Sequence, residues 1–198
     1  MIKLISFDLQ GTLSSAKFSD DFWLEILPRK YATFHNTSIE SAKKELREEF
    51  KKFGKYDFRY YDNRYWEKVL KFDTKQEFKK LESPKLCLEL LDFIKSLPLP
   101  HIIFSTTTHD FIYYELGEFS NLFDTIISTL DDYHIAGKSE EAYRILAKNF
   151  NLLPKEILHI GDNKIMDIDN AQKVGFQTIY FDSLKSIADL IEQIRGKL

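Results

Sequence analysis

The architecture of the chain is clearest between residues 157 and 175. This stretch reads Ile157-Leu158-His159-Ile160-Gly161-Asp162 and continues through Asp167-Ile168-Asp169-Asn170-Ala171 to Gly175. The apolar run before Gly161 indicates a short strand that is buried on both faces. The residues after it predict a helix over 164–174, which Gly175 ends because glycine adopts a left-handed conformation at little cost. A buried strand followed directly by a helix is typical of a parallel sheet covered by helices.

The same alternation of short apolar runs and helical patterns extends over most of the chain. Strands are expected at residues 2–7, 102–105, 125–128, 157–160 and 178–181. Helices are expected at residues 84–96, 109–117, 139–150, 164–174 and 184–194. Ser83 and Pro84 predict the start of the first helix, since serine is a good N-cap and proline suits the first helical position. The sequence therefore predicts an α/β fold with a doubly wound parallel sheet.

Residues 14–83 differ in composition from the rest of the chain. They hold 16 basic and 13 acidic residues, and 15 of the aromatic residues, of which the whole chain has 17 Phe, 10 Tyr and 2 Trp. Their apolar residues recur at helical spacing, and Thr37 with Glu40 forms a capping-box pattern. We therefore predict a helical domain at 14–83, inserted into a core of residues 1–13 and 84–198. The aromatic residues either bury a small helical bundle or line a substrate pocket.

The composition excludes several classes of protein. The 198 residues carry a formal net charge of -3, and no apolar stretch reaches the roughly 20 residues that a bilayer requires. Met1 leads directly into a strand-like segment and not into a signal peptide, so we expect a cytoplasmic protein without membrane contact. The single cysteine, Cys87, excludes an internal disulfide and a cysteine-based zinc cluster. Basic and acidic residues interleave over residues 43–49, which indicates a solvated helix face and no nucleic-acid partner. The oligomeric state is left open.

Polar residues follow the predicted strands at their carboxyl ends. They are Asp8-Leu9-Gln10-Gly11-Thr12 after the first strand, Ser105-Thr106 after the second, Lys138 before the helix that leads to the fourth, and Gly161-Asp162 and Asp167 after the fourth. Because the carboxyl ends of parallel strands meet at one edge of the sheet, we expect these side chains to converge. A carboxylate, a hydroxyl, a cation and further carboxylates are groups from which a catalytic site is built.

The chain resembles the haloacid dehalogenase-like (HAD) hydrolase superfamily, whose four motifs match Asp8-x-x-Gly11-Thr12, Ser105, Lys138 and Gly161-Asp162-x-x-x-x-Asp167. The helical insert is similar to the type 1 cap of that superfamily, and the resemblance covers the whole chain. It implies a Rossmann-like core and an Mg²⁺-dependent hydrolase. The activity that it favours is that of a phosphatase acting on a small phosphorylated metabolite.

The resemblance also implies a role for each motif residue. Asp8 would attack the phosphoryl group and form an aspartyl-phosphate, with Lys138 and Gln10 as the other catalytic residues. A carboxylate and a phosphate dianion repel each other, so a divalent cation is needed, and oxygen ligands favour Mg²⁺. The implied metal group comprises Asp8, the Gln10 carbonyl, Asp162 and Asp167, the last of which would orient Lys138 or a metal-bound water. Thr12, Ser105, Thr106 and Lys138 would bind the phosphorylated substrate.

Gln10 departs from the phosphatase pattern of the superfamily, which has at this position an aspartate that protonates the leaving group and activates water. An amide cannot transfer a proton at neutral pH, and general acid–base catalysis typically contributes about 10²- to 10⁴-fold. One interpretation of Gln10 is a phosphatase that acts on substrates whose leaving group needs little protonation, such as acyl phosphates or phosphoanhydrides. Alternatively, the chain is a slow or non-enzymatic protein that binds a phosphorylated ligand, or a phosphonatase-like hydrolase of C–P bonds that uses a lysine of the insert.

Overall fold

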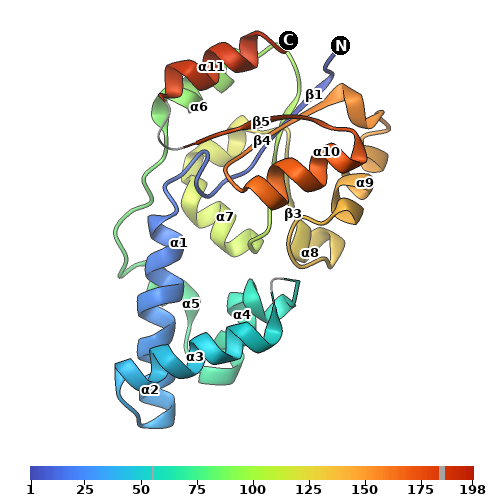
Figure 1. Ribbon diagram of the computed structural model, residues 1–198. Coiled ribbons are helices and arrows are strands. Elements are labelled where there is room, and N and C mark those ends of the chain that lie inside the picture. The colour runs from blue at the N-terminus through green and yellow to red at the C-terminus, as the bar shows by residue number, and fades with distance from the viewer. Residues whose placement is uncertain (55, 183–185) are drawn as a thin grey trace.

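The computed structural model describes residues 1–54, 56–182 and 186–198. At its centre lies a sheet of five parallel strands in the order β3-β2-β1-β4-β5 (Figure 1). The strands are β1 (Leu4–Phe7), β2 (His101–Ser105), β3 (Thr125–Ser128), β4 (Ile157–Gly161) and β5 (Gln177–Tyr180). Every residue of the two central neighbours, β1 and β4, is buried. All five strands expected from the sequence are therefore present, and their parallel arrangement is confirmed.

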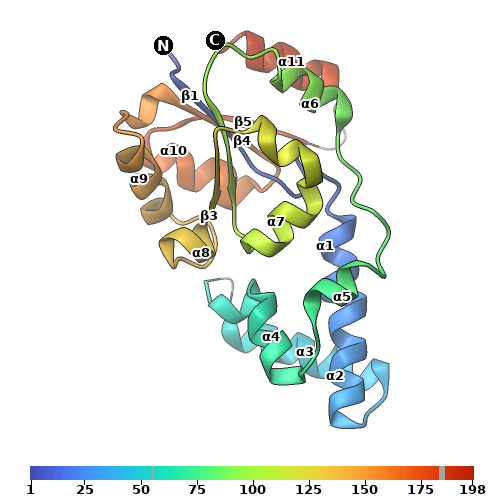
Figure 2. The ribbon, with the colours of Figure 1, turned by 180° about the vertical axis from the view of Figure 1, so that it is seen from behind.

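Helices cover both faces of the sheet (Figures 1 and 2). On one face, α6 (Leu88–Ile94), α7 (His109–Leu116) and α11 (Ile187–Arg195) share an apolar cluster with the central strands. On the other face, α9 (Glu140–Asn149) and α10 (Asn170–Val174) form a second cluster with the same sheet. The predicted doubly wound α/β fold is confirmed.

Shorter helical segments complete this part of the chain. They are η3 (Gly117–Leu122), α8 (Thr129–Tyr133), η4 (Pro154–Glu156) and η5 (Lys164–Asp169). The helix expected over 164–174 begins as the wide π-helical turn η5 and continues as α10, which Gly175 ends with a φ of 104°. Residues 184–185 of the helix expected at 184–194 lie outside the described residues. No helix among the described residues is long and apolar enough to cross a membrane.

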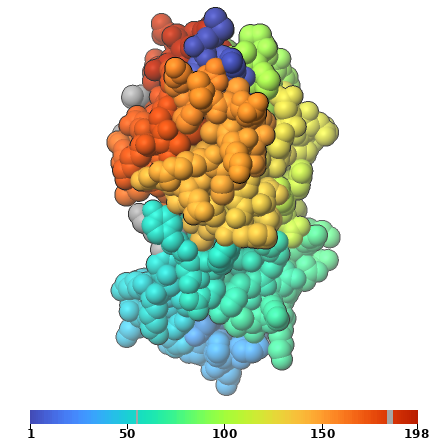
Figure 3. All heavy atoms as spheres, turned by 90° about the vertical axis from the view of Figure 1, so that its right-hand side faces the viewer, coloured from blue at the N-terminus to red at the C-terminus, as the bar shows by residue number. Residues whose placement is uncertain are grey.

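A second, helical part, here called the helical unit, spans residues 17–78 and lies beyond the carboxyl ends of the strands (Figure 1). It forms one end of the molecule (Figure 3). Its elements are α1 (Lys17–Asp21), η1 (Phe22–Ile26), α2 (Leu27–His35), α3 (Ile39–Phe53), η2 (Phe58–Tyr60), α4 (Asn63–Leu70) and α5 (Thr74–Phe78). Two apolar clusters rich in aromatic side chains hold it together. One of them includes Phe111 of α7, so it also joins the helical unit to the sheet.

Two extended segments connect the helical unit to the sheet and pair with each other. The Ser15 N–H donates to the Lys85 carbonyl at 2.9 Å, and the Cys87 N–H donates to the Leu13 carbonyl at 2.8 Å. The chain therefore leaves the sheet and returns to it at the same place.

Two helix starts differ from the sequence prediction. Residues 84–86 are not helical, and α6 begins at Leu88 with Cys87 as its N-cap, because the backbone of this segment bonds to the outgoing one. The expected start at Ser83 and Pro84 is therefore wrong. In α3 the N-cap is Ser38, whose side chain accepts from a backbone N–H three residues on, so the predicted capping box at Thr37 is wrong by one residue.

Candidate active site

The candidate site lies where β1, β2 and β4 end, beside the helical unit. A cavity of about 310 Å³ is lined there by seven of the residues that the motifs predicted: Asp8, Gln10, Ser105, Thr106, Lys138, Asp162 and Asp167. Thr12 does not line it. Thr12 lines a separate cavity with Gly11, and its buried hydroxyl has no hydrogen-bond partner within the described part of the chain. The structure therefore brings the predicted site residues together with the exception of Thr12.

Lys138 lies buried between two carboxylates. Its ammonium nitrogen is 2.5 Å from Asp8 Oδ1 and 2.6 Å from Asp167 Oδ1, and only 1% of the residue is exposed. A buried lysine keeps its charge at tolerable cost only when it is paired in this way. Its backbone is fixed as well, because its carbonyl accepts from Asn170 Nδ2 at 2.8 Å and the next residue, Ser139, is the N-cap of α9.

Asp167 is held by several donors at once. Its Oδ1 accepts from Lys138 and lies 3.2 Å from His159 Nε2, while its Oδ2 accepts from the Asn163 N–H at 2.9 Å. His159 is itself buried, with Nδ1 3.0 Å from the Ser6 hydroxyl oxygen. Both oxygens of Asp167 are thus engaged, which suits a residue that orients Lys138.

Burial and neighbouring charges shift the pKa values of this cluster. Burial raises the pKa of Asp8 to about 8, and although Lys138 opposes this shift, the Asp167 and Asp162 carboxylates add to it. Burial acts on Asp167 in the same direction, but Lys138 and His159 outweigh it and hold the pKa of that carboxyl well below its usual range. One lysine therefore does not balance three carboxylates, and a further cation would favour the ionised form of Asp8.

The carboxylates form a set of oxygen donors that suits a divalent metal ion. One oxygen from each of Asp8, Asp162 and Asp167 lies within 4.8 Å of the others. Asp162 makes no ion pair within the described residues, so its carboxylate is available to a ligand. Oxygen-only donors of this kind are preferred by Mg²⁺. The residues present therefore fit the metal that the motifs imply.

Two glycines allow the carboxylates to approach the backbone. A Cβ on Gly11 would collide with the Asp162 carboxylate, and a Cβ on Gly161 would collide with that of Asp167. Gly11 also has a φ of 86°, which disfavours other residues. Larger residues at either position would displace a carboxylate of the cluster.

Gln10 contacts a buried carboxylate that no motif indicated. Its side-chain Nε2 donates to Glu115 Oε1, and Ser14 Oγ donates to Glu115 Oε2 at 2.7 Å. Glu115, on α7, is only 2% exposed, and burial raises its pKa to about 7. Because Glu115 engages the amide nitrogen of Gln10, the amide oxygen is the atom left to accept a hydrogen bond in the cavity.

The sequence gives weak evidence that Glu115 makes a buried polar contact. The buried face of α7 consists of Phe111, Ile112, Glu115 and Leu116. A lone acidic residue at an apolar position of a helix indicates a buried polar contact. The sequence does not reveal that the partner of this residue is Gln10, because the contact depends on how α7 packs against the loop after β1.

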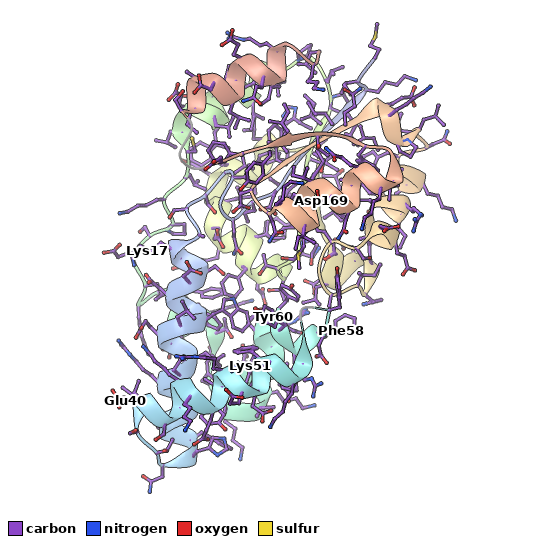
Figure 4. All side chains as sticks on the ribbon, viewed as in Figure 1. Lys17, Glu40, Lys51, Phe58, Tyr60 and Asp169 are labelled. Carbon is purple, nitrogen blue, oxygen red and sulfur yellow. The ribbon has the colours of Figure 1, made fainter. Side chains whose placement is uncertain are left out.

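The helical unit closes the cavity from the opposite side. Tyr60 and Tyr61 line the cavity together with Met166 of η5, and Figure 4 shows Tyr60 on the side of the helical unit that faces the sheet. The cavity is therefore bounded by both parts of the molecule.

Polar contacts hold the start of α4 against the helices after β2 and β3. The buried Asn63 accepts from the Thr108 hydroxyl at 2.7 Å through Oδ1. The neighbouring Arg64 pairs with Asp131 at 2.5 Å. Both contacts join the helical unit to the edge of the sheet at which the site lies.

Comparison with known proteins gives a consistent picture. The model of the haloacid dehalogenase-like hydrolase family matches residues 2–175. None of the curated proteins is a significant match. The chain is similar in structure to a HAD phosphatase from Thermococcus onnurineus, with a TM-score of 0.76, 16% identity and coverage of 93% of this chain and 88% of that chain.

Two other solved structures are also similar. A HAD-superfamily hydrolase from Ehrlichia chaffeensis has a TM-score of 0.60 and 21% identity, with coverage of 100% of this chain and 98% of that chain. A predicted phosphoglycolate phosphatase from Haemophilus somnus has a TM-score of 0.62 and 19% identity, with coverage of 90% and 84%. At these identities the likeness demonstrates a shared fold.

Proposed function

The chain belongs to the haloacid dehalogenase-like hydrolase family, and from this premise we propose that it is an Mg²⁺-dependent phosphatase of a small phosphorylated compound. The observation that supports this proposal is the grouping of Asp8, Lys138, Asp162 and Asp167 around one cavity at the strand ends. A buried cation between carboxylates, beside free carboxylate oxygens, suits the binding of a phosphoryl group together with a metal ion.

In the proposed reaction, a carboxylate oxygen of Asp8 forms a bond to phosphorus while the bond to the leaving-group oxygen breaks. A water molecule then attacks the phosphorus of the aspartyl-phosphate, and the bond between phosphorus and the Asp8 oxygen breaks. The protons of the water leave with the inorganic phosphate, and the Asp8 carboxylate is restored. Lys138 offsets the charge of the phosphoryl oxygens, and Ser105 and Thr106 donate hydrogen bonds to them. Asp167 keeps Lys138 in position through the 2.6 Å contact.

Asp8, Asp162 and the carbonyl of Gln10 would hold Mg²⁺. The ion supplies the positive charge that lets a carboxylate approach a phosphate dianion. The raised pKa of Asp8 supports this assignment, because a bound cation favours the ionised carboxylate that acts as the nucleophile.

Gln10 would orient the attacking water without taking its proton. Glu115 holds the amide nitrogen, so the amide oxygen accepts from the water. Such a site favours substrates whose leaving group departs without protonation, as in acyl phosphates. We therefore expect acetyl phosphate to be hydrolysed more readily than unactivated esters.

The phosphonatase-like alternative has less support. It requires a lysine of the insert near the reacting atoms, yet among the described residues the cavity at Asp8 and the cavity that adjoins it are lined by no lysine of 14–83. We therefore retain phosphate hydrolysis as the proposed activity.

A phosphatase assay with acetyl phosphate and an aryl phosphate, with and without Mg²⁺, tests the proposal. We expect Mg²⁺-dependent release of phosphate that falls to background in Asp8→Asn, because an amide cannot form the acyl phosphate. Asp92→Asn, which changes an exposed residue on α6, is the matched control and should retain activity. Release of phosphate by Asp8→Asn at the rate of the wild type would contradict the proposal.

A further inference from the structure

We propose that the leaving group of the substrate carries a planar ring whose polar end has both hydrogen-bond donors and acceptors. This inference rests on the proposed function, since it concerns the group attached to the phosphate. It follows from a second cavity of about 400 Å³ between the helical unit and the strand ends. A cavity of this size suits a small organic group.

The second cavity is continuous with the site at Asp8. The two cavities share four lining residues, Gln10, Tyr60, Tyr61 and Thr106. A phosphoryl group at Asp8 and Lys138 therefore directs the rest of the substrate past Gln10 into the second cavity. The residues that line only this cavity should recognise the leaving group.

Aromatic rings form one wall of the second cavity. Trp23, Phe50 and Tyr60 line it, with the Phe50 ring edge-on to Trp23 at 6.3 Å and to Tyr60 at 5.3 Å between centroids. Trp23 is fixed from behind because it stacks on Phe111 of α7 with an interplanar angle of 7°. A wall of pre-positioned rings favours a planar, apolar group that can pack or stack against it.

An arginine and an aspartate that have no ion-pair partner among the described residues also line this cavity. Arg47 on α3 and Asp20 on α1 make no ion pair or side-chain hydrogen bond within the described residues, whereas Lys43 on the same helix is paired with Glu25 at 2.6 Å. A guanidinium donates paired hydrogen bonds to an acceptor, and a carboxylate accepts them from N–H groups.

The required ligand therefore presents both kinds of group. Because Arg47 and Asp20 do not pair with each other, both remain available to a ligand that reaches them across the aromatic wall. Two sources have this chemistry: a nucleobase, whose edge carries donors and acceptors, and the ammonium and carboxylate of a phosphorylated aromatic amino acid.

Matched pairs of substrates test the proposal and separate the two sources. Both members of the first pair are unactivated esters that a site without a proton donor hydrolyses slowly, so the ratio of their rates is what is compared. We expect kcat/KM for one or more nucleoside 5′-monophosphates to exceed that for ribose 5-phosphate by about tenfold or more, as stacking of a base on an aromatic side chain allows. If the source is an amino acid, O-phosphotyrosine should instead exceed phenyl phosphate by a similar factor. Ratios near one in both pairs, from an enzyme that hydrolyses acetyl phosphate, would overturn the ring assignment and leave the proposed function standing.

A binding measurement covers the case of a chain with no turnover. Trp23 lines the cavity, whereas Trp66, the other tryptophan, is buried behind Phe50 and does not line it. In Asp8→Asn, a nucleotide or phosphotyrosine should quench tryptophan fluorescence saturably in the presence of Mg²⁺, and ribose 5-phosphate should not. Absence of quenching by every ring-bearing phosphate would contradict the inference even if acetyl phosphate is not hydrolysed.

Two exposed positions provide variants that should fold. Tyr60→Leu removes a ring that is 40% exposed, and Arg47→Gln removes the unpaired charge. We expect each to reduce the preference for the ring-bearing substrate at least threefold. Tyr113→Leu, 52% exposed on α7, and Arg29→Gln on α2 are the matched controls and should preserve the preference. Equal losses in controls and cavity variants would contradict the assignment of this wall.

Discussion

Glu115 gives Gln10 a defined orientation. A glutamine amide can face either way, but only its nitrogen can donate to a carboxylate. The contact with Glu115, which also accepts from Ser14 at 2.7 Å, therefore fixes the acceptor end of Gln10 toward the cavity. The amide at position 10 is thus accompanied by a second residue, Glu115, that accepts a hydrogen bond from its nitrogen.

Restoring a carboxyl group at position 10 tests this pairing. We expect Gln10→Asp combined with Glu115→Gln to raise hydrolysis of phenyl phosphate by roughly 10²-fold, since a carboxyl group can protonate the leaving group. Gln10→Asp alone would bring two buried carboxyls together, so we expect a smaller gain and a lower stability. Values of kcat/KM and unfolding curves for both single variants and the double variant provide the measurement. No gain in the double variant, with Mg²⁺ still bound, would mean that proton transfer does not limit turnover.

Glu115 also makes stability depend on pH. Burial raises its pKa to about 7 in the folded chain, above the ordinary value of 4.5, so the folded chain binds the proton more tightly. Stability should therefore fall as pH rises from about 4.5 to 7, by about 3 kcal/mol, and stay low above that range. Glu115→Gln cannot ionise, so its urea unfolding free energy should fall less between pH 5 and pH 8 than that of the wild type. Identical losses would contradict the assigned pKa.

At the scale of elements, α4 connects the helical unit to the sheet through few polar contacts. Asn63, its first residue, is buried against Thr108, the N-cap of α7. The Asn63 Nδ2 already has no partner among the described residues, so the bond from Thr108 is the side-chain contact that this amide retains. The boundary between the two parts therefore includes a buried amide whose one side-chain contact is to the hydroxyl of Thr108.

Thr108→Val removes this hydroxyl while keeping the shape of the side chain. The buried amide of Asn63 would lose its partner, which typically costs about 1–3 kcal/mol. We expect the free energy of unfolding to fall by that amount in a denaturant titration. Thr33→Val, on the exposed surface of α2, is the control and should change stability by less than about 0.5 kcal/mol. A Thr108 variant as stable as the control would show that the contact does not hold the boundary.

The sequence predicts some elements better than others for physical reasons. Each strand is a short apolar run, and Asp8 and Asp162 follow strand ends directly, so topology alone brings them together. The start of α6 depends instead on backbone pairing with a segment far away in the chain, which outweighs the local preference of Pro84. Ser38 and Thr37 are both good N-caps, so the pattern does not distinguish them. Contacts between side chains of distant elements, such as the contact of Gln10 with Glu115, are the hardest to predict from the sequence.

At the scale of the whole molecule, the site links distant parts of the chain. Asp8 follows β1 and Asp162 follows β4, and they meet only when the sheet has formed. A ligand that binds only the folded chain stabilises it, by about 2.7 kcal/mol at one hundred times its Kd. Metal binding should therefore be visible in the unfolding of the entire chain.

Thermal unfolding during an Mg²⁺ titration provides this measurement. We expect Tm to rise with Mg²⁺ in the wild type and in the control Asp92→Asn, because the exposed residue 92 lies on α6 away from the site. Asp162→Asn removes a proposed ligand and should abolish the rise. A Tm that is independent of Mg²⁺ in the wild type would contradict the metal assignment.

The paired segments at residues 13–15 and 85–87 also have a consequence for how this protein can be modified. Since the exit and return of the chain lie side by side, a short turn could join them without moving β1 or α6. The helical unit is in this sense a removable module, and a different module with equally close ends could be grafted in its place. The exchange would alter the leaving-group specificity proposed for the helical unit and keep the phosphate chemistry proposed for the sheet.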